Sequence, residues 1–493
     1  MIGLGVPGFV WADLFSPEKL EELAGVFDCF FRERAPEAFA RFDAYRKCKG
    51  DGMTPEQQSD ALLGAAPELS AFVQKLFGVE AQAKALRGDV DGRAVLWTFR
   101  HEFVKKRLFG KDPGKPWRDS GLSHALARAC AEVALAAAAT SDGDEELYVA
   151  RGTVALFELD DIARKAKKHG GAHWSDELRA RSQKICSALR ADARTAAATP
   201  AEDDAAIARA LDAVESVLAE RRQDHHDEAR RWPSLRQPHN LDFQHLVQLR
   251  RPEPELPELF VGPDEERRQR GDFRLTDERG TARQVEQEID YCIYCHERDK
   301  DSCSKGLRDK DGSVKKNPLG VELGGCPLGE KISEMHVMRR NGDPIAALSL
   351  VTVDNPMCAG TGHRICNDCM KACVFQKQEP VNIPQIETRV LTEVLALPYG
   401  VEIYTLLMRF NPLNVERPHA RPYNGKNVLV VGLGPAGYTL CHHLACEGFG
   451  VVAIDGLKLE PLPATLTGAE GRAPDPILDA NSIYSKLDER ILL

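Results

Sequence analysis

Eight of the fourteen cysteines lie in one stretch of the sequence, between residues 292 and 373. The beginning of the sequence has neither the basic stretch nor the cleavage site of an export signal, so we expect a cytoplasmic protein. In that setting a dense group of thiols favours metal binding over disulfides. The eight candidates are Cys292, Cys295, Cys303, Cys326, Cys358, Cys366, Cys369 and Cys373.

Two kinds of metal centre fit thiols at this spacing. One structural zinc ion would use the two C-x-x-C pairs at 292–295 and 366–369, and would leave the other four sulfurs unexplained. A 4Fe-4S cluster takes one terminal ligand per iron, so two clusters would take about eight ligands. A nearby dinucleotide site favours the clusters, because a nucleotide cofactor supplies electrons that zinc cannot carry. A zinc-stabilised interaction protein remains the alternative.

The dinucleotide site is predicted from the sequence NVLVVGLGPAG, in which an apolar strand runs into a glycine-rich turn. Gly432 permits the tight turn, Gly434 allows the backbone to approach a phosphate, and Gly437 permits close packing of helix and strand. Pro435 and Ala436 complete the turn, at the N-terminus of a helix that favours a pyrophosphate. A second strand, VVAID, ends at Asp455, where a carboxylate can accept hydrogen bonds from an adenosine ribose.

The order of these motifs resembles a known family. CIYC, GCPLGE, the cysteine-rich segment, EPVNIPQIE and the strand–turn–helix follow one another over about residues 285–456. This order is similar to that of the glutamate synthase small subunit and the N-terminal region of dihydropyrimidine dehydrogenase. The resemblance implies a helical domain with two 4Fe-4S clusters, followed by an FAD domain and an NADPH domain.

The resemblance also implies which residues hold each cluster. The ligands of the first would be Cys292, Cys295, Cys303 and Cys373. Those of the second would be Cys326, Cys366, Cys369 and Glu387, the last at a position where the family has Gln or Glu. The sequence departs from the family in an extra segment, residues 304–325, and in the tighter spacing of Cys366 and Cys369. Cys358 is the spare candidate for the second cluster, and no residue is predicted to be catalytic.

The remaining sequence predicts a multidomain, mainly α fold that ends in an incomplete Rossmann-like βαβ unit. We expect a helical domain over 1–248, a Pro-rich linker over 249–270, the helical two-cluster domain over 271–423 and the dinucleotide domain from 424. Ser16, Thr54 and Thr199 each precede a proline and are predicted N-caps. After Thr199, residues Ile207, Leu211, Val214 and Leu218 recur at helical spacing and predict one buried stripe.

Composition and length narrow the function. A formal net charge of −10 argues against general attraction to nucleic acid, and the longest apolar run is interrupted by Arg128 and Glu132, so we expect no membrane span. Too few residues follow Asp455 to complete a flavin domain, which leads us to expect a fragment or one part of a split enzyme. The predicted function is electron transfer between FAD and a partner, with NAD(P)H bound on a missing domain. The partner would be a redox protein or the remaining flavin and nicotinamide domains.

Overall fold

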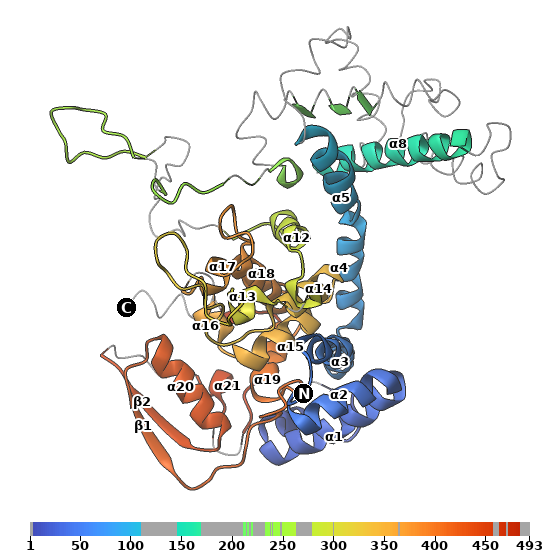
Figure 1. Ribbon diagram of the computed structural model, residues 1–493. Helices are drawn as coiled ribbons and strands as arrows, with labels where there is room; N and C mark the ends of the chain where they lie inside the picture. The colour runs from blue at the N-terminus through green and yellow to red at the C-terminus, as the bar shows by residue number, and fades with distance from the viewer. Residues whose placement is uncertain are drawn as a thin grey trace. The chain divides into compact units, whose positions relative to one another are not determined.

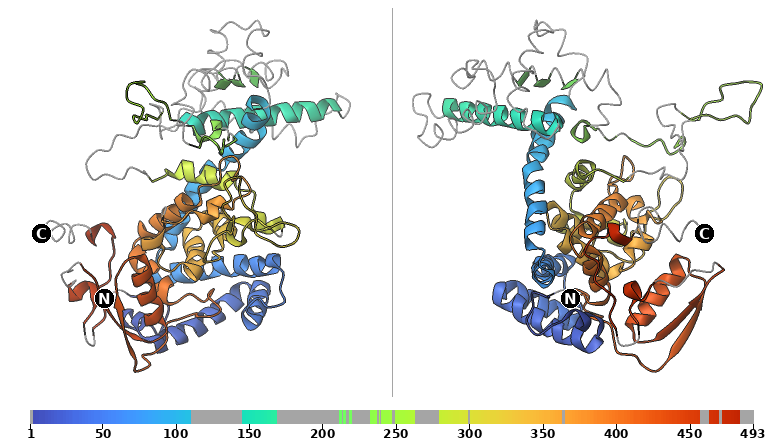
Figure 2. Two further views of the ribbon diagram at one scale, coloured as in Figure 1. Left: turned by 60° about the vertical axis from the view of Figure 1, so that its left-hand side comes forward. Right: turned by 180° about the vertical axis from the view of Figure 1, so that it is seen from behind.

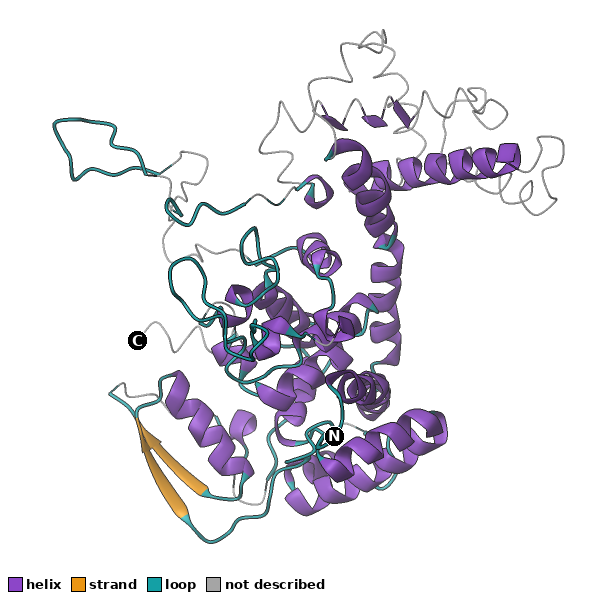
Figure 3. Ribbon diagram, viewed as in Figure 1, coloured by secondary structure: helices purple, strands orange, loops and turns teal. Residues whose placement is uncertain are grey.

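The computed structural model groups the chain into two compact units, Met1–Asp89 with His239–Leu493, and Val90–Pro238 (Figure 1). The residues that it describes are 3–109, 145–168, 232–236, 240–246, 249–262, 279–298, 300–362, 365–456, 463–469 and 472–483, with Pro238 and some positions in 211–219. Most of these residues are helical, and the named strands are two, as Figure 3 shows by colour. The prediction of a mainly α protein is therefore confirmed for the described residues.

Three helices follow the short helix η1 (Trp11–Phe15) near the N-terminus. They are α1 (Pro17–Arg34), α2 (Pro36–Cys48) and α3 (Pro55–Phe77), and each begins with proline at its first position. Ser16 accepts a hydrogen bond from the backbone of Lys19, and Thr54 exchanges bonds with Gln57 in a capping box. These two predicted N-caps are confirmed, whereas Thr199 lies outside the described residues.

The cysteine-rich domain, which we expected over 271–423 and which is described from residue 279, contains mostly short helices. Its helices are α12 (Ala282–Tyr291), η6 (Cys295–Arg298), α13 (Ser302–Lys305), α14 (Ile332–Arg340), α15 (Pro344–Asp354), α16 (Cys358–Thr361), α17 (Asp368–Lys371), α18 (Ile383–Leu395) and α19 (Gly400–Arg409). Helix α15 is buried along most of its length, and α14, α18 and α19 pack around it. The cysteines lie on the short helices and turns at the edge of this helical core.

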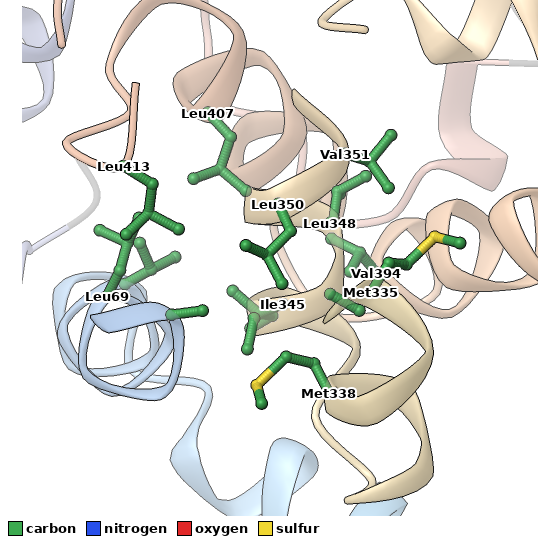
Figure 4. Close-up of a cluster of buried hydrophobic side chains, with 14 of the residues drawn as sticks. Leu69, Met335, Met338, Ile345, Leu348, Leu350, Val351, Val394, Leu407 and Leu413 are labelled. Atoms are coloured by element: carbon green, nitrogen blue, oxygen red, sulfur yellow. The ribbon is translucent and has the colours of Figure 1, made fainter. Parts of the chain in front are cut away.

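The N-terminal helices share a hydrophobic core with the cysteine-rich domain. Helix α3 packs on both α14 and α15, and Figure 4 shows Leu69 of α3 close to Ile345 and Leu413. We expected a separate domain over 1–248. The compact units divide the chain differently, because residues 1–89 belong to the same unit as the cysteine-rich domain. The physical reason is that α3 buries a broad apolar face, from Leu62 to Phe77, which α1 and α2 cover only in part.

The second unit contains the C-terminal end of α4 (Glu80–Arg93), α5 (Val95–Thr98), the π-helix η2 (Phe99–Leu108), α8 (Glu145–Lys168) and η4 (Pro233–Leu235). Buried Arg100 donates hydrogen bonds to the carbonyl oxygens of Pro233 and Ser234, which fixes η4 within the unit. The predicted stripe is confirmed at Leu211, Val214 and Leu218, which are buried in this unit's core, while Ile207 is outside the described residues.

The predicted βαβ unit is present. Strands β1 (Asn427–Val431) and β2 (Gly450–Ile454) pair in parallel, and α20 (Pro435–Cys446) packs on both strands (Figure 2). The second strand lies one residue earlier than expected, so Asp455 follows it directly. After α21 (Ala464–Thr467) the chain returns to the helices, where the backbone N–H of Tyr399 donates to the carbonyl of Leu478.

No single helix in the described part of the chain is both long and apolar enough to cross a membrane. Helices α18 and α19 meet the criterion only as a pair that bends by 117°.

Candidate functional site: two groups of buried sulfurs beside a glycine turn

The first sulfur group brings together four cysteines from four separate segments. Cys292 ends α12, Cys295 begins η6, Cys303 lies in α13 and Cys373 follows α17. Cys295, Cys303 and Cys373 are buried, Cys292 is half-buried, and none of the four is in a disulfide. These are the residues that the resemblance assigned to the first cluster.

The charges of these cysteines affect one another's pKa values. Burial raises the pKa of the Cys292 thiol to about 12, and the nearby Cys373 and Cys295 raise it further. The pKa of Cys303 is also raised well above its usual value by burial, with smaller contributions from Asp301 and then from the other three cysteines. The thiols of Cys292 and Cys303 therefore stay protonated unless positive charge enters the group, because burial disfavours the thiolate and neighbouring thiolates repel one another. Bound iron would supply that charge.

Backbone N–H groups point at the sulfurs in both groups. Tyr294 donates its N–H to the sulfur of Cys292 at 3.4 Å. Burial raises the pKa of the Cys373 thiol, and hydrogen bonds from the N–H groups of Phe375 and Val381 offset part of that rise. In the second group burial and the charge of Glu330 raise the pKa of the Cys326 thiol, and the N–H groups of residues 328–330 offset part of that rise. Donors that favour the thiolate form fit a site for iron, because the thiolate is the species that binds metal.

The second sulfur group combines cysteines with carboxylates. Burial raises the pKa of the Cys369 thiol, and the charges of Cys326, Glu330 and Glu387 raise it further. Glu387, on α18, is 8% exposed, and burial, followed by the neighbouring carboxylate of Glu330, raises its pKa. The structure thus places Cys326 and Glu387 near Cys369. Glu330 was missed, although its place in GCPLGE, close after Cys326, could have suggested it.

The fourth predicted ligand of this group, Cys366, has an exposed side chain that forms a hydrogen bond with Asp368. Cys358 is buried instead, and the charge of Glu387 contributes, after burial, to raising the pKa of its thiol. The sulfur of Cys358 donates to the hydroxyl of Tyr404 at 3.8 Å, and the same hydroxyl donates to the carbonyl of Pro356 at 2.8 Å. Cys358 therefore has a partner within the protein as a neutral thiol.

The extra segment between Cys303 and Cys326 does not separate the two groups. Residues 307–323 fold back on themselves, with Arg308 bridged to Val314 and Lys316 to Glu322. As a result the backbone N–H of Cys326 donates to the carbonyl of Cys303 at 2.8 Å. Residues 304–325 therefore form a loop whose two ends meet, which keeps Cys303 and Cys326 close together.

The glycine turn has the conformation that the sequence predicted. Gly432 has a φ of 97°, and a Cβ atom on Gly437 would lie 1.8 Å from the carbonyl oxygen of Gly432. Gly434, Pro435 and Ala436 are exposed, so the turn is open to a ligand. The carboxylate of Asp455 accepts a hydrogen bond from the backbone N–H of Leu433, which brings this acid to the turn.

A contact connects the glycine turn with the second sulfur group. The hydroxyl of Tyr438, in the first turn of α20, donates to the carbonyl of Gly360 in α16. Helix α16 begins at Cys358, and a Cβ atom on the next glycine, Gly362, would lie 2.4 Å from a carboxylate oxygen of Glu387. Helix α16 therefore contacts both α20, which follows the glycine turn, and Glu387 of the second sulfur group.

Within the described residues, no group of three or more His, Cys, Asp or Glu side chains is placed to hold a metal ion.

Comparison with known proteins finds similarity over parts of the chain only. Two uncharacterized proteins of Rickettsia prowazekii are 59% identical over 106 residues and 54% identical over 56 residues. A glutamate synthase (NADPH) small chain of Mycobacterium tuberculosis is 30% identical over 132 residues, or 27% of this chain. The matched stretches span 15%, 19% and 24% of these relatives. No family model matches the chain, and no solved structure does.

Proposed function

We propose that this chain is the electron-transfer module of an oxidoreductase that uses FAD, iron–sulfur clusters and NAD(P)H, similar to the glutamate synthase small subunit. The observation that carries the proposal is the first sulfur group, in which four unbridged cysteines from four segments, three of them buried, are close neighbours. The partial similarity to a glutamate synthase small chain supports the same class of protein.

In this proposal each sulfur group holds one 4Fe-4S cluster. The first would be bound by Cys292, Cys295, Cys303 and Cys373, and the second by Cys326, Cys366, Cys369 and Glu387. Such clusters accept and release single electrons when bound. The chain's own residues bury the sulfurs, direct N–H donors at them and surround the second group with carboxylates.

The glycine turn would bind the pyrophosphate of FAD, with Gly432, Gly434, Pro435, Ala436 and Gly437 at the helix N-terminus and Asp455 beside the ribose. The contact from Tyr438 to Gly360 supports a short path from this site to the second sulfur group. NAD(P)H would bind to a part of the protein outside this chain. The partner would be the remaining flavin and nicotinamide domains or a separate redox protein.

Metal and sulfide content of the anaerobically purified chain tests the proposal. We expect about eight iron and eight inorganic sulfide per chain, the content of two 4Fe-4S clusters, and a broad visible absorbance that bleaches on reduction. Stoichiometric zinc without sulfide, in a colourless protein, would instead support the zinc-stabilised interaction protein and end the redox proposal.

A further inference from the structure

Tyr294 adopts a backbone conformation that a bulky side chain rarely takes. Its φ is 52°, in the left-handed region where an aromatic residue is strained. In this conformation the N–H of Tyr294 points at the sulfur of Cys292, 3.4 Å away. The strain is therefore located at a turn that directs a hydrogen bond to a sulfur of the first group.

Two contacts hold Tyr294 in this conformation. Its hydroxyl donates to the carbonyl of Ile289 at 3.1 Å, and its ring is 7% exposed. The guanidinium of Arg340, the last residue of α14, lies over the ring at 4.4 Å from its centroid. A cation in this position is attracted by the face of the ring, so Arg340 helps to fix the strained turn.

Arg340 also acts on the sulfurs through its charge. Its guanidinium lies 4.4 Å from the centroid of the Tyr294 ring, and the backbone nitrogen of Tyr294 is 3.4 Å from the sulfur of Cys292, so this charge lies close to the first sulfur group. A cation that favours a thiolate also favours added negative charge on a cluster bound to that thiolate, because net charge and hydrogen bonds to sulfur set the reduction potential.

We propose that Arg340 and Tyr294 form a tuning pair that raises the reduction potential of the cluster bound by Cys292, Cys295, Cys303 and Cys373. Arg340 supplies the positive charge and, by packing on the ring, holds the turn that directs the N–H of Tyr294 at Cys292. Both are positioning residues and neither is a ligand. The inference rests on the proposed function, because it requires a cluster in the first sulfur group.

Redox titration followed by EPR of the reduced clusters, on the full chain, tests the pair. With Arg340→Gln we expect the reduction potential of the first cluster to fall by about 59 mV. For a one-electron couple this corresponds to a fall of about tenfold in the ratio of reduced to oxidised cluster at a fixed potential. Arg340→Lys retains the charge and should recover most of the shift. Glycine tolerates the positive φ, but Tyr294→Gly removes the ring on which Arg340 packs. The reduction potential of the first cluster should therefore also fall in this variant.

The matched control is Arg32→Gln, which removes another arginine that lies over an aromatic ring, here Phe39 at 4.7 Å, on helices without candidate ligands. Cys292→Ser identifies which EPR signal belongs to the first cluster. The inference is overturned if Arg340→Gln leaves that signal's potential unchanged, shifts both clusters equally, or acts no differently from Arg32→Gln. If the Arg340→Gln protein loses iron, the Arg340→Met protein is titrated instead. Methionine is also neutral, and its side chain still covers the Tyr294 ring. Wild-type protein without iron and sulfide would instead overturn the proposed function.

Discussion

At the scale of single residues, Glu387 distinguishes the second sulfur group from the first. It is buried beside Cys369 and Glu330, and burial together with the charge of Glu330 raises its pKa, so the neutral acid is favoured unless a cation or metal binds. As a harder ligand than thiolate, it would give the second cluster a different potential from the first.

Glu387→Ala should therefore change the EPR signal or potential of one cluster and leave the other intact. Cys358→Ser should have little effect, since the thiol of Cys358 already donates to Tyr404. Cys366→Ser should lose the second cluster, about half of the iron, because Cys366 is the predicted third thiolate. If Glu387→Ala and Cys366→Ser both retain two clusters and Cys358→Ser loses one, Cys358 is a ligand of the second cluster.

His336 predicts a pH dependence of stability. It is 1% exposed, neither ring nitrogen has a hydrogen-bond partner among the described residues, and burial lowers its pKa to about 3. The unfolded chain, where histidine has a pKa of about 6.5, binds the proton more readily than the folded protein. Stability is therefore complete above pH 6.5 and is lost as the pH falls toward 3.

Urea unfolding at pH 7.5 and 5.5 should show this loss in the wild type and a weaker one in His336→Leu. His245→Gln, which removes an exposed histidine, provides the control. If the free energy of unfolding changes by the same amount between the two pH values in all three proteins, the assignment to His336 is contradicted.

At the scale of elements, Gly437 is the point where α20 and β1 come closest. A methyl group there would overlap the carbonyl of Gly432, so Gly437→Ala should destabilise the βαβ unit by about 1–3 kcal/mol. Hydrogen exchange of the β1 and β2 amides should become faster. Gly25→Ala, in the middle of α1 with open space around it, should instead stabilise its helix by about 0.5–1 kcal/mol. Similar exchange in both variants would contradict the close packing.

Helix α3 belongs to the core of the cysteine-rich domain, and Leu69 is the residue to test. Leu69 is fully buried against that core, so Leu69→Ala should cost about 2–5 kcal/mol in the free energy of unfolding. Because α3 also packs on η6, which begins at Cys295, iron content should fall in the same variant. Val26→Ala, at a residue that is 37% exposed on α1, should change stability by less than about 0.5 kcal/mol. If α3 were a separate domain, Leu69→Ala would leave the iron content unchanged.

At the scale of the whole molecule, one face of the two-stranded sheet has no cover in the described residues. Leu429, Val431, Val452 and Ile454 share this face and are 48% to 75% exposed, whereas α20 covers the opposite face. A parallel sheet is normally buried on both faces. The exposed face supports the proposal that further strands and helices of a flavin domain pack here.

This chain should accordingly bind FAD weakly or not at all, because the βαβ unit offers only the adenosine side of the site. Equilibrium dialysis or flavin fluorescence of the purified chain measures this directly. Tight, stoichiometric binding of FAD would contradict the prediction and indicate that the βαβ unit is sufficient.

The sequence by itself determined the local features. The proline-led N-caps at Ser16 and Thr54, the buried stripe at Leu211, Val214 and Leu218, and the glycine turn with its two strands depend on neighbouring residues and were predicted correctly. Only the tertiary structure decided which distant residues meet. It joined α3 to the cysteine-rich domain, brought Cys373 to Cys292, placed Glu330 beside Glu387, and left Cys366 exposed while Cys358 was buried. Such contacts depend on how apolar faces far apart in the chain pack together, and spacing along the sequence does not specify that packing.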